Sequence, residues 1–268
     1  MNRFKDKIVI VTGGGGTLGG SIAKAFINEG AKVVLIGRTL VKLQAKANEI
    51  DPSSKATLCI ATNVLSIEGL NSAKQKILDE FGTIDILINA AGGNKKGATI
   101  APEQTFFDIS TDDFEAVSRL NLMGTVLPSQ VFGKVFADKK EGVVLNISSM
   151  AADRVITRVI GYSASKAAME NFTKSLSVEM ALKFGEGIRV NAIAPGFFIG
   201  EQNRFLLLNE DGSYTERGNT IIQNTPMKRF GNEEEINGAV LFLCSPESKF
   251  ITGAVLPIDG GFSAFSGV

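Results

Sequence analysis

The feature that most constrains the fold lies near the start of the chain. A short apolar, β-branched run, Ile8 to Val11, passes directly into a glycine-rich segment, Thr12 to Gly20, and then into a helical pattern of apolar residues. A second apolar run, Lys32 to Ile36, follows at the spacing of a β-α-β unit. Continuous apolar runs of this length are typical of strands that are buried on both faces in a parallel sheet. The beginning of the chain therefore predicts an α/β fold.

The same alternation continues along the 268 residues. Further strands are predicted by five apolar runs: Thr57 to Ala61, Ile84 to Ile88, Gly142 to Leu145, Ile188 to Ile193 and Ala254 to Ile258. Helices are predicted between them, at Leu40 to Ile50, Ser66 to Phe81, after a cap at Thr111 to Asp113, and after Tyr162. This order predicts a three-layer, Rossmann-type, doubly wound parallel sheet of about seven strands.

The length of the chain suits one domain of this class. We therefore expect a single dinucleotide-binding domain over residues 1–268. The polar, mixed segment from Glu201 to Asn224 predicts a short helical lid over the substrate, within residues 197–226.

The glycine-rich segment predicts a dinucleotide site. Backbone N–H groups at a helix amino terminus bind phosphate, and glycines let the backbone approach a pyrophosphate closely. A flexible loop is the alternative interpretation of a glycine cluster, but the position between a strand and a helix favours binding. The residues expected to contact the nucleotide here are Gly13, Gly16, Thr17, Leu18 and Gly19.

The end of the second predicted strand bears on which dinucleotide is used. An NAD site usually places an acidic residue there, against the ribose 2′-hydroxyl. This protein has Gly37, Arg38 and Thr39 instead. Arg38 would pair with a 2′-phosphate, so NADP(H) is favoured over NAD(H). Alternatively, Arg38 only covers the adenine.

Polar or small residues follow three further predicted strands. Because the carboxyl ends of parallel strands meet at one edge, we expect these residues to line the same crevice. Asn63 would hydrogen-bond the adenine, small residues would let the nucleotide lie against the backbone, and the turn after Pro195 would reach the nicotinamide. Ordinary turns also contain such residues. The residues expected to contact the nucleotide are Asn63, Val64, Asn89, Ala90, Ala91, Pro195, Gly196 and Phe198.

The chemistry is expected between Asn146 and Lys166. Ser149 follows an apolar strand, and Tyr162 and Lys166 lie one helical turn apart at the start of the next predicted helix. Such a tyrosine and lysine pair also occurs on solvated helices. The sequence has no histidine, however, so an enzyme of this sequence must move protons with tyrosine, lysine or carboxylate groups. Asn121 lies among apolar residues, which suggests a water-binding or structural role in the site.

Composition narrows the classes of partner. Lysine plus arginine and aspartate plus glutamate each number 28, so no strong field would attract nucleic acid or acidic lipid. The amino terminus has no signal-peptide core, and no run of ~18 apolar residues predicts a membrane span, so we expect a cytoplasmic protein. Cys59 and Cys244 are expected to be buried free thiols. Without histidine, we expect no metal site and no zinc-dependent dehydrogenase.

With these motifs placed, the sequence resembles the short-chain dehydrogenase/reductase family over essentially its full length. The motifs that carry the resemblance are Thr12 to Gly19, Asn89 to Gly92, the set Asn121, Ser149, Tyr162 and Lys166, and the turn Pro195-Gly196. The resemblance implies that this set is a catalytic tetrad and that the protein is a homotetramer. Two residues depart from the family pattern: Thr17 replaces a glycine, and Gly200 replaces a threonine that often contacts the carboxamide.

The resemblance also implies roles within the tetrad. Tyr162 would exchange a proton with the carbonyl oxygen, which Ser149 would hold. Lys166 would bind the ribose and lower the pKa of Tyr162. Asn121 would anchor a water that leads protons to bulk solvent.

Within the family, the segments 91–94, 197–207 and 259–263 look like those of the D-mannonate oxidoreductases (fructuronate reductases). This implies a sugar-acid substrate, whose carboxylate needs a cation. The candidates for substrate contact are Asn94, Arg154, Arg158 and Arg204, although each arginine is equally compatible with a solvated surface. The alternatives are a gluconate 5-dehydrogenase-like enzyme, a 3-oxoacyl-thioester reductase, and a dinucleotide-binding sensor without turnover.

Overall fold

Seven parallel strands form one sheet in the computed structural model, which describes residues 2–200 and 203–267. The strand order is β3-β2-β1-β4-β5-β6-β7, so the direction of winding reverses between β1 and β4. The strands are β1 (Ile8–Thr12), β2 (Lys32–Gly37), β3 (Thr57–Ala61), β4 (Ile86–Asn89), β5 (Gly142–Ile147), β6 (Ile188–Pro195) and β7 (Val255–Ile258). The predicted doubly wound α/β fold is therefore confirmed.

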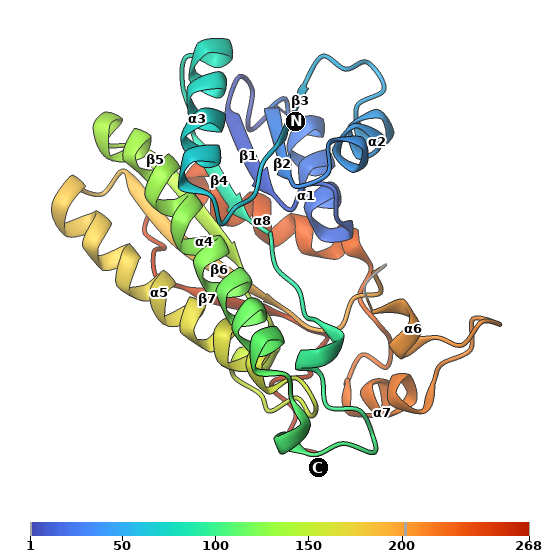
Figure 1. Cartoon of the computed structure of the whole chain (residues 1–268). Coiled ribbons are helices and arrows are strands. Elements are labelled where there is room, and N and C mark those ends of the chain that lie inside the picture. Colours follow the sequence, from blue (N-terminus) through green and yellow to red (C-terminus); the bar gives the residue numbers. More distant parts are fainter. Residues whose placement is uncertain (1, 201–202, 268) are drawn as a thin grey trace.

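Helices cover both faces of this sheet (Figure 1). One face carries α1 (Thr17–Asn28), α2 (Leu40–Ile50) and α8 (Asn237–Cys244), and the other carries α3 (Ile67–Phe81), α4 (Thr111–Lys139) and α5 (Ile160–Phe184). Two short helices, α6 (Arg204–Leu207) and α7 (Glu216–Asn224), follow β6. The 3-10 helices are η1 (Lys96–Ala98), η2 (Phe106–Asp108), η3 (Met150–Ala152), η4 (Glu233–Ile236) and η5 (Pro246–Ser248).

The two covered faces explain the apolar runs of the sequence. Successive residues of β1 point to opposite faces, so Val9 and Val11 pack with α1 and α8, whereas Ile8 and Ile10 pack with α3 and α4. Every residue of β1 is buried. A strand between two helical layers therefore needs apolar residues at every position, without the alternation of a half-exposed strand.

Local capping sets where two predicted helices begin. The Ser66 hydroxyl accepts a hydrogen bond from the Gly69 N–H at 3.1 Å, so this residue caps α3, which starts at Ile67. The long helix α4 was expected to be capped from Thr111, but its cap is Ser110, which accepts from the Asp113 N–H at 3.3 Å. Thr111 to Asp113 instead form the first turn, where the negative charges of Asp112 and Asp113 interact favourably with the positive end of the helix dipole.

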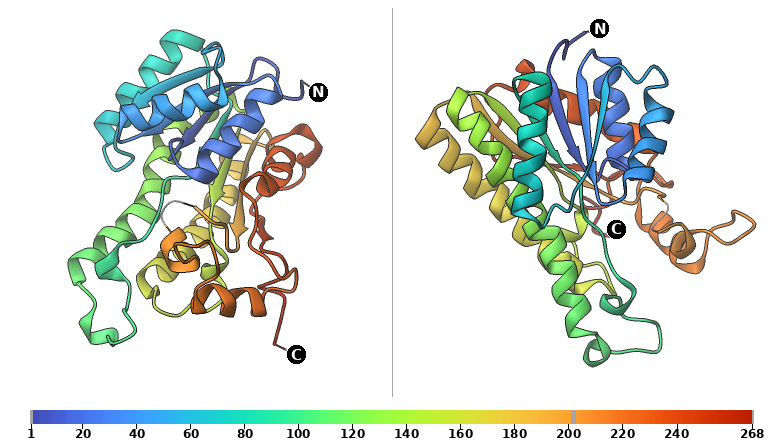
Figure 2. Two further views of the ribbon diagram at one scale, coloured as in Figure 1. Left: turned by 90° about the vertical axis from the view of Figure 1, so that its right-hand side faces the viewer. Right: turned by 45° about the horizontal axis from the view of Figure 1, so that its top comes forward.

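The segments that follow the strands gather beyond one end of the sheet. In Figure 2, the connection after β4 and the helices α6 and α7 extend beyond the same end. The segment predicted to be a helical lid contains α6 and α7, and its residues 201 and 202 lie outside the described residues. That it covers a substrate stays a prediction. This end of the sheet is the one at which the predicted site residues lie.

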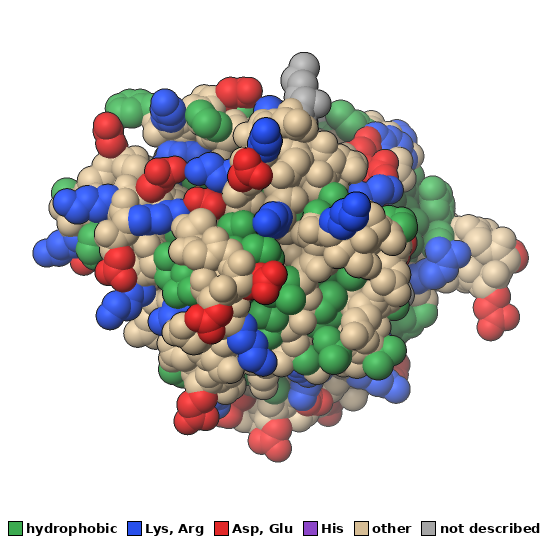
Figure 3. Space-filling view, turned by 90° about the horizontal axis from the view of Figure 1, so that it is seen from above, with side chains coloured by type: hydrophobic (Ala, Val, Ile, Leu, Met, Phe, Trp, Pro, Cys, Tyr) green, Lys and Arg blue, Asp and Glu red, His purple; other side chains and the backbone are tan. Residues whose placement is uncertain are grey.

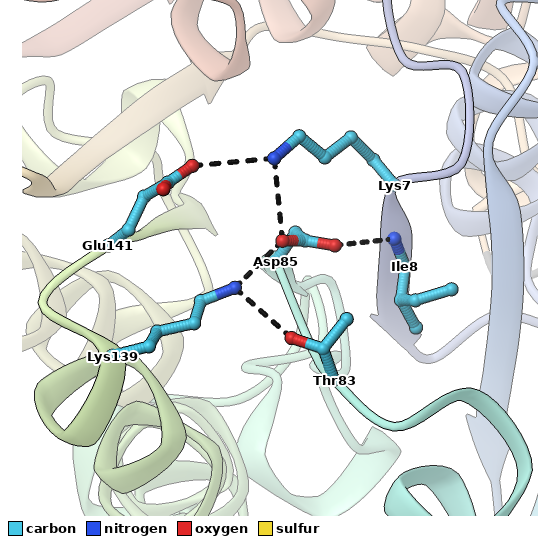
Figure 4. Close-up of polar contacts among 6 residues, drawn as sticks. All are labelled: Lys7, Ile8, Thr83, Asp85, Lys139 and Glu141. Carbon is cyan, nitrogen blue, oxygen red and sulfur yellow. Dashed lines mark hydrogen bonds and ion pairs between the residues drawn. The ribbon is translucent and has the colours of Figure 1, made fainter.

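The opposite end is held by a cluster of charges (Figure 4). Asp85, just before β4, accepts hydrogen bonds from the Ile8 N–H at 2.9 Å and from Lys139 Nζ at 2.7 Å. Lys7 Nζ lies 3.5 Å from the same carboxylate and 3.3 Å from Glu141. One half-buried carboxylate thus ties the starts of β1 and β4 to the end of α4.

The surface and the thiols also bear on the sequence-based expectations. Acidic and basic side chains are interspersed over the face shown in Figure 3. No helix within residues 2–200 and 203–267 combines the length and the apolar character that crossing a bilayer requires. Cys59 and Cys244 are both free; Cys244 is buried as expected, but Cys59 on the edge strand β3 is only half-buried.

Candidate active site

The glycine turn between β1 and α1 is shaped by the packing of the protein itself. Gly13 has a φ of 67°, and a β-carbon at this position would lie 2.7 Å from the Ala90 carbonyl oxygen. A β-carbon at Gly19 would lie 2.5 Å from the Gly13 carbonyl oxygen. Both glycines are therefore required before any nucleotide binds, because a larger residue would clash with backbone atoms.

The amino terminus of α1 fits a pyrophosphate. Its cap is Gly16, which provides no side-chain acceptor, and its first turn contains no acidic residue. The first N–H groups of a helix have no partner within the helix, and their partial positive charge favours an anion. Gly16 is exposed, whereas Leu18 packs partly against the core. Gly16, with the half-buried Thr17 beside it, is therefore where a phosphate can approach.

A threonine that the sequence analysis did not select fixes the neighbouring turn. Thr12 is fully buried at the end of β1, and its hydroxyl accepts hydrogen bonds from the Ala90 and Ala91 N–H groups at 3.1 and 3.2 Å. The turn after β4 is thus held against the glycine turn. No local pattern indicated this contact, because the partners lie 78 and 79 residues apart.

The two residues that depart from the family pattern lie next to each other. A β-carbon at Gly200 would lie 3.2 Å from the Thr17 hydroxyl oxygen and 3.6 Å from its β-carbon. The threonine at position 17 therefore occupies the space beside position 200, and the absence of a side chain at Gly200 accommodates it. The sequence alone had presented these two departures as separate.

Arg38 lies directly after the second strand of the chain, as the sequence predicted. It follows β2, its side chain is exposed, and it forms no ion pair with a described carboxylate. Its guanidinium is therefore available to an anion at this edge. Asn63, after β3, is also exposed, but its side chain accepts a hydrogen bond from the Leu65 N–H at 3.0 Å, which stabilises the local turn. Val64 is 5% exposed and packs in the core.

Three other residues that were expected to contact the nucleotide use their side-chain or backbone groups in contacts within the protein. Asn89 is buried, and its amide donates to Ser129 and Asn146 at 3.0 and 2.9 Å, on the side of α4 and α5. The ring of Phe198 faces Gly231, where a β-carbon would come within 2.4 Å of it. Gly196 pairs with β7 through its N–H. The Asn89 amide hydrogens are therefore engaged, whereas its buried Oδ1 has no partner among the described residues, and the Phe198 ring is packed against Gly231.

The residues of the predicted tetrad come together around Gly92. A β-carbon at Gly92 would lie 2.7 Å from Asn121 Oδ1 and 3.4 Å from Lys166 Nζ. Lys166 Nζ also lies 5.7 Å from the centre of the Tyr162 ring. The Ser149 hydroxyl, just after β5, is close enough to the Tyr162 phenol to lower the pKa of that phenol. Four residues from three separate segments are thus neighbours.

Asn121 has a structural role in this arrangement. It is fully buried in α4, and its side chain accepts from the Gly93 N–H at 3.1 Å. Its amide donates to the carbonyl oxygens of Gly93 and Val117 at 2.7 and 2.8 Å. Both amide hydrogens are therefore engaged, and the side chain holds the turn after β4 in place. Of the two roles expected for this residue, the contacts support the structural one.

Lys166 is a buried amine in an unfavourable environment. It is 5% exposed, and its Nζ donates to the Ile147 carbonyl oxygen at 2.7 Å. Burial lowers its pKa to about 8, and the negative charge of Glu170 only partly offsets this. A group with such a pKa exchanges protons near neutral pH, which is typical of functional sites.

The expected effect of Lys166 on Tyr162 is not found. Burial raises the pKa of the Tyr162 phenol, and the neighbouring Ser149 hydroxyl lowers that pKa only in part. Lys166 lies near the face of the ring and directs its ammonium group to a backbone carbonyl. The protein without a dinucleotide therefore keeps the phenol protonated, and the lowering of its pKa by Lys166 stays a prediction for the dinucleotide-bound protein.

A carboxylate that the sequence analysis missed lies behind the tetrad. Ser148, directly before Ser149, donates its hydroxyl to Glu170 Oε1 at 2.6 Å. Glu170 follows Lys166 by one turn of α5. Burial raises the pKa of Glu170, and the hydrogen bond from Ser148 lowers it in part. The only signal in the sequence was the i, i+4 spacing from Lys166, which also occurs on ordinary helix surfaces.

The residues predicted to bind the substrate are placed differently from one another. Asn94 is exposed and donates to the Thr99 hydroxyl at 2.8 Å. Arg154 is exposed, lies 3.6 Å from Asp153, and donates to the Ser263 carbonyl oxygen. Arg204, on α6, is exposed. Arg158 is half-buried in the turn before α5.

Comparison with known proteins agrees with this site. A family model described as enoyl-(acyl carrier protein) reductase matches residues 15–263. An uncharacterized oxidoreductase of Bacillus subtilis, UxuB, is 43% identical over 98% of this chain and 96% of its own length. The chain belongs to the short-chain dehydrogenase/reductase family. The resemblance in the motifs is thus confirmed, and the protein is an oxidoreductase that binds a nicotinamide dinucleotide.

Solved structures of the family have the same fold. A Haemophilus influenzae protein, provisionally named a D-mannonate oxidoreductase and solved with bound NAD, is 42% identical. It superposes with a TM-score of 0.93 and covers 100% of this chain and 98% of its own. A short-chain dehydrogenase of Bacillus anthracis is 35% identical with a TM-score of 0.84, over 98% and 99% of the two proteins.

Proposed function

We propose that this short-chain dehydrogenase/reductase interconverts a secondary alcohol and a ketone on a sugar acid, with D-mannonate and D-fructuronate as the pair. The buried Lys166 beside Tyr162 and Ser149, at the same end of the sheet as the glycine turn, supports the alcohol and ketone chemistry. The sugar-acid substrate is supported by the Haemophilus influenzae relative, which covers the whole chain and carries the D-mannonate oxidoreductase name.

In this proposal, Tyr162 is the acid or base. Its raised pKa keeps the phenol protonated, so it is ready to donate a proton to a carbonyl oxygen during reduction. In oxidation the phenol must first lose that proton, and the Lys166 ammonium is the nearby cation that favours the phenolate. Ser149 holds the same oxygen by a hydrogen bond. The dinucleotide, when bound, supplies or accepts the hydride.

Asn121 and Thr12 position this chemistry without touching the substrate. Asn121 bonds the backbone of Gly93, and Thr12 bonds the backbone of Ala90 and Ala91, so buried side chains hold the turn after β4. This backbone passes directly over Lys166, because a β-carbon at Gly92 would lie 3.4 Å from Nζ. The preorganised turn therefore supports the position of the lysine.

We further propose that NADP(H) is preferred to NAD(H). The exposed Arg38 at the end of β2, without a described acidic neighbour in ion-pair contact, supports a contact with a 2′-phosphate. The Haemophilus influenzae relative contains NAD, so both dinucleotides need to be measured. Arg38→Asp is expected to weaken NADP(H) binding ~10- to 100-fold and to change NAD(H) binding much less. Equal losses for both would contradict the preference.

The substrate is tested by a panel assay. Purified protein is given hexonates or ketohexonates, neutral polyols or ketoses, and a 3-oxoacyl thioester, each with both dinucleotides. The highest kcat/KM is expected for D-mannonate or D-fructuronate. A higher value for a neutral polyol would favour the gluconate 5-dehydrogenase-like alternative.

Two other outcomes of the panel separate the remaining alternatives. A higher value for the thioester would favour a role like that of the 3-oxoacyl-[acyl-carrier-protein] reductase of Aquifex aeolicus, which is 32% identical over 97% of this chain. Dinucleotide binding without turnover on any compound would indicate a sensor.

We also propose that residues 1–268 form one domain, and that the protein is a cytoplasmic homotetramer. Apolar residues on the surface of α5 support self-association: Val178 and Leu182, one turn apart, are 58% and 78% exposed. The apolar tail packs on the lid segment, since the Phe262 ring contacts Phe197 with centres 5.3 Å apart. Light scattering coupled to size exclusion tests the tetramer, and a monomer at micromolar concentration would contradict it.

A further inference from the structure

Two half-buried arginines lie between the lid and the turn that leads to Tyr162. Arg158 belongs to the turn before α5, and Arg217 belongs to α7. Arg158 is one of the four residues that the sequence predicted to contact the substrate, whereas Arg217 was not predicted. Their positions are connected only by the folding of the protein, since 59 residues separate them.

The backbone of Arg158 is held in a costly conformation. Its φ of 76° lies in the left-handed region, which is unfavourable for a residue with a β-carbon. The Ile100 N–H donates to the Arg158 carbonyl oxygen at 3.0 Å, and Arg158 Nε donates to the Ile100 carbonyl oxygen. Bonds in both directions thus fix this arginine against the connection after β4, and it stands four residues before Tyr162.

Arg217 reaches the same turn from the lid. Its Nη2 donates to the Thr157 carbonyl oxygen at 3.4 Å, so its guanidinium lies against the peptide that joins Thr157 to Arg158. Helix α7 is fixed at its start by the Thr215 hydroxyl, which accepts from the Gly218 N–H at 3.0 Å. A cavity of about 440 Å³ lies between this helix and residues 155–157, and Arg217 lines it.

The charges of these two arginines are not neutralised by the described part of the protein. Arg154 lies 3.6 Å from Asp153, and Arg229 lies 2.6 Å from Glu235, but Arg158 and Arg217 form no ion pair. Burial lowers the pKa of Arg217, and the positive charge of Arg158 lowers it further. Glu216 also lines the cavity, but it is exposed and bonds neither arginine. Arg217 lines the cavity, and the charge of Arg158, beside residues 155–157, acts on Arg217. Two half-buried cations without a carboxylate among the described residues favour the binding of an anion here.

We propose that Arg158 and Arg217 together bind the carboxylate of the substrate. This inference rests on the proposed sugar-acid function. It places the carboxylate site of that substrate between one residue of the turn before α5 and one residue of α7. The planar donor groups of two guanidiniums match the lone pairs of a carboxylate. The bound acid joins α7 to the turn before Tyr162, whereas a neutral polyol leaves the two cations unpaired. The pair therefore selects acids over polyols.

The test uses two substrates that differ in one group. A ketohexonate is compared with a ketohexose of the same carbon number, each reduced by the full-length protein. Arg217→Gln is expected to lower kcat/KM for the acid ~10- to 100-fold, mainly through KM, and to change the value for the neutral ketose less than ~2-fold. Arg217→Lys keeps the positive charge but not the planar pair of donors of a guanidinium. It is expected to lower kcat/KM for the acid less than Arg217→Gln does.

Three controls keep the result interpretable. The dinucleotide affinity and the midpoint of thermal unfolding of each variant are measured, so that a folding defect is recognised. If Arg217→Gln does not fold, Arg158→Lys and Arg217→Lys serve instead, with the ratio of the two KM values as the readout. Arg154→Gln and Arg204→Gln test the other two arginines predicted to bind substrate.

The outcomes separate this inference from the proposed function. If the unmodified protein prefers the acid and Arg217→Gln lowers that preference, the arginine pair is supported. If the unmodified protein prefers the acid but Arg217→Gln keeps the preference, or Arg154→Gln or Arg204→Gln lowers it more, the pair is overturned while the function stands. If the unmodified protein does not reduce the acid, the proposed function itself fails.

Discussion

Two lysines at opposite ends of the sheet have opposite electrostatic environments. At the amino end, Lys139 Nζ lies 2.7 Å from Asp85 Oδ1, in a cluster that also contains Lys7 and Glu141 (Figure 4). At the carboxyl end, Lys166 is 5% exposed, bonds a backbone carbonyl, and forms no ion pair with any carboxylate in the described ranges. The charge of Lys139 is thus balanced by a carboxylate, whereas the charge of Lys166 is buried without one.

This difference indicates which end stabilises the fold and which end performs the chemistry. Burial raises the pKa of Asp85, but the hydrogen bonds from Ile8 and Lys139 outweigh burial and bring it below its usual value. That carboxylate therefore contributes to stability. Lys166 has its pKa lowered to about 8 because the charge of Glu170 compensates burial only in part. Its charge costs stability, and such a cost is typical of a functional site.

The largest expected effect is the loss of turnover in Tyr162→Phe. Removing the phenolic proton is expected to lower kcat ~1,000-fold, with dinucleotide affinity changed less than ~3-fold, because general acid–base catalysis contributes on this scale. The matched control is Tyr214→Phe, since Tyr214 is the other tyrosine of the protein and packs on Phe230 with ring centres 5.3 Å apart. Steady-state kinetics and fluorescence titration measure both. A nearly normal rate in Tyr162→Phe would remove it from the acid–base role.

The second effect compares Lys166→Met with Lys139→Met. Lys166→Met is expected to lower kcat/KM ~100-fold without lowering the free energy of unfolding, because a buried charge without a carboxylate partner is replaced by an apolar group. Lys139→Met is expected to do the reverse: it keeps the rate and loses ~1 kcal/mol of stability, since it breaks a half-exposed ion pair with Asp85. Urea unfolding and kinetics on both variants check this. Equal stability losses would show that the two ends do not differ.

The third effect is the loss of stability in Asp85→Asn. Hydrogen bonds to a charged group are worth ~2 kcal/mol, so we expect a loss of about that size in urea unfolding at neutral pH. Because the folded pKa of Asp85 lies below its unfolded value, its contribution is present above the unfolded pKa and is lost as the pH falls through the folded pKa. On acidification, the free energy of unfolding of the Asp85→Asn variant should therefore fall less than that of the unmodified protein. An equal acid sensitivity would contradict this assignment.

The smallest effect is the pH dependence that Lys166 adds at alkaline pH. Its folded pKa of about 8 lies below the unfolded value, so between the two the unfolded state binds more protons. Stability relative to Lys166→Met should therefore rise by ~1 kcal/mol between pH ~8 and ~9. Urea unfolding of both proteins over this range measures the difference. A parallel dependence in the two proteins would mean that the amine is not deprotonated there.

Much of the site was predictable because its motifs are local. The strand, glycine turn and helix from Ile8 onward predicted the fold, and the spacing of Tyr162 and Lys166 placed both on one turn of α5. Contacts over long separations were not predictable. Thr12 reaches Ala90 and Ala91, Thr17 faces Gly200, and Arg217 reaches Thr157 across 60 residues. Each depends on which segments the sheet brings together.

The sequence by itself determined the α/β fold, the order of its elements and the family, because apolar periodicity and glycine turns act over a few residues. Only the tertiary structure decided the electrostatics. Burial raised the pKa of Tyr162 and lowered that of Lys166, and the approach of α7 to the turn before α5 brought together two arginines that form no ion pair with a described carboxylate. Desolvation and pairing depend on every segment that surrounds a group, and no stretch of the sequence specifies those surroundings alone.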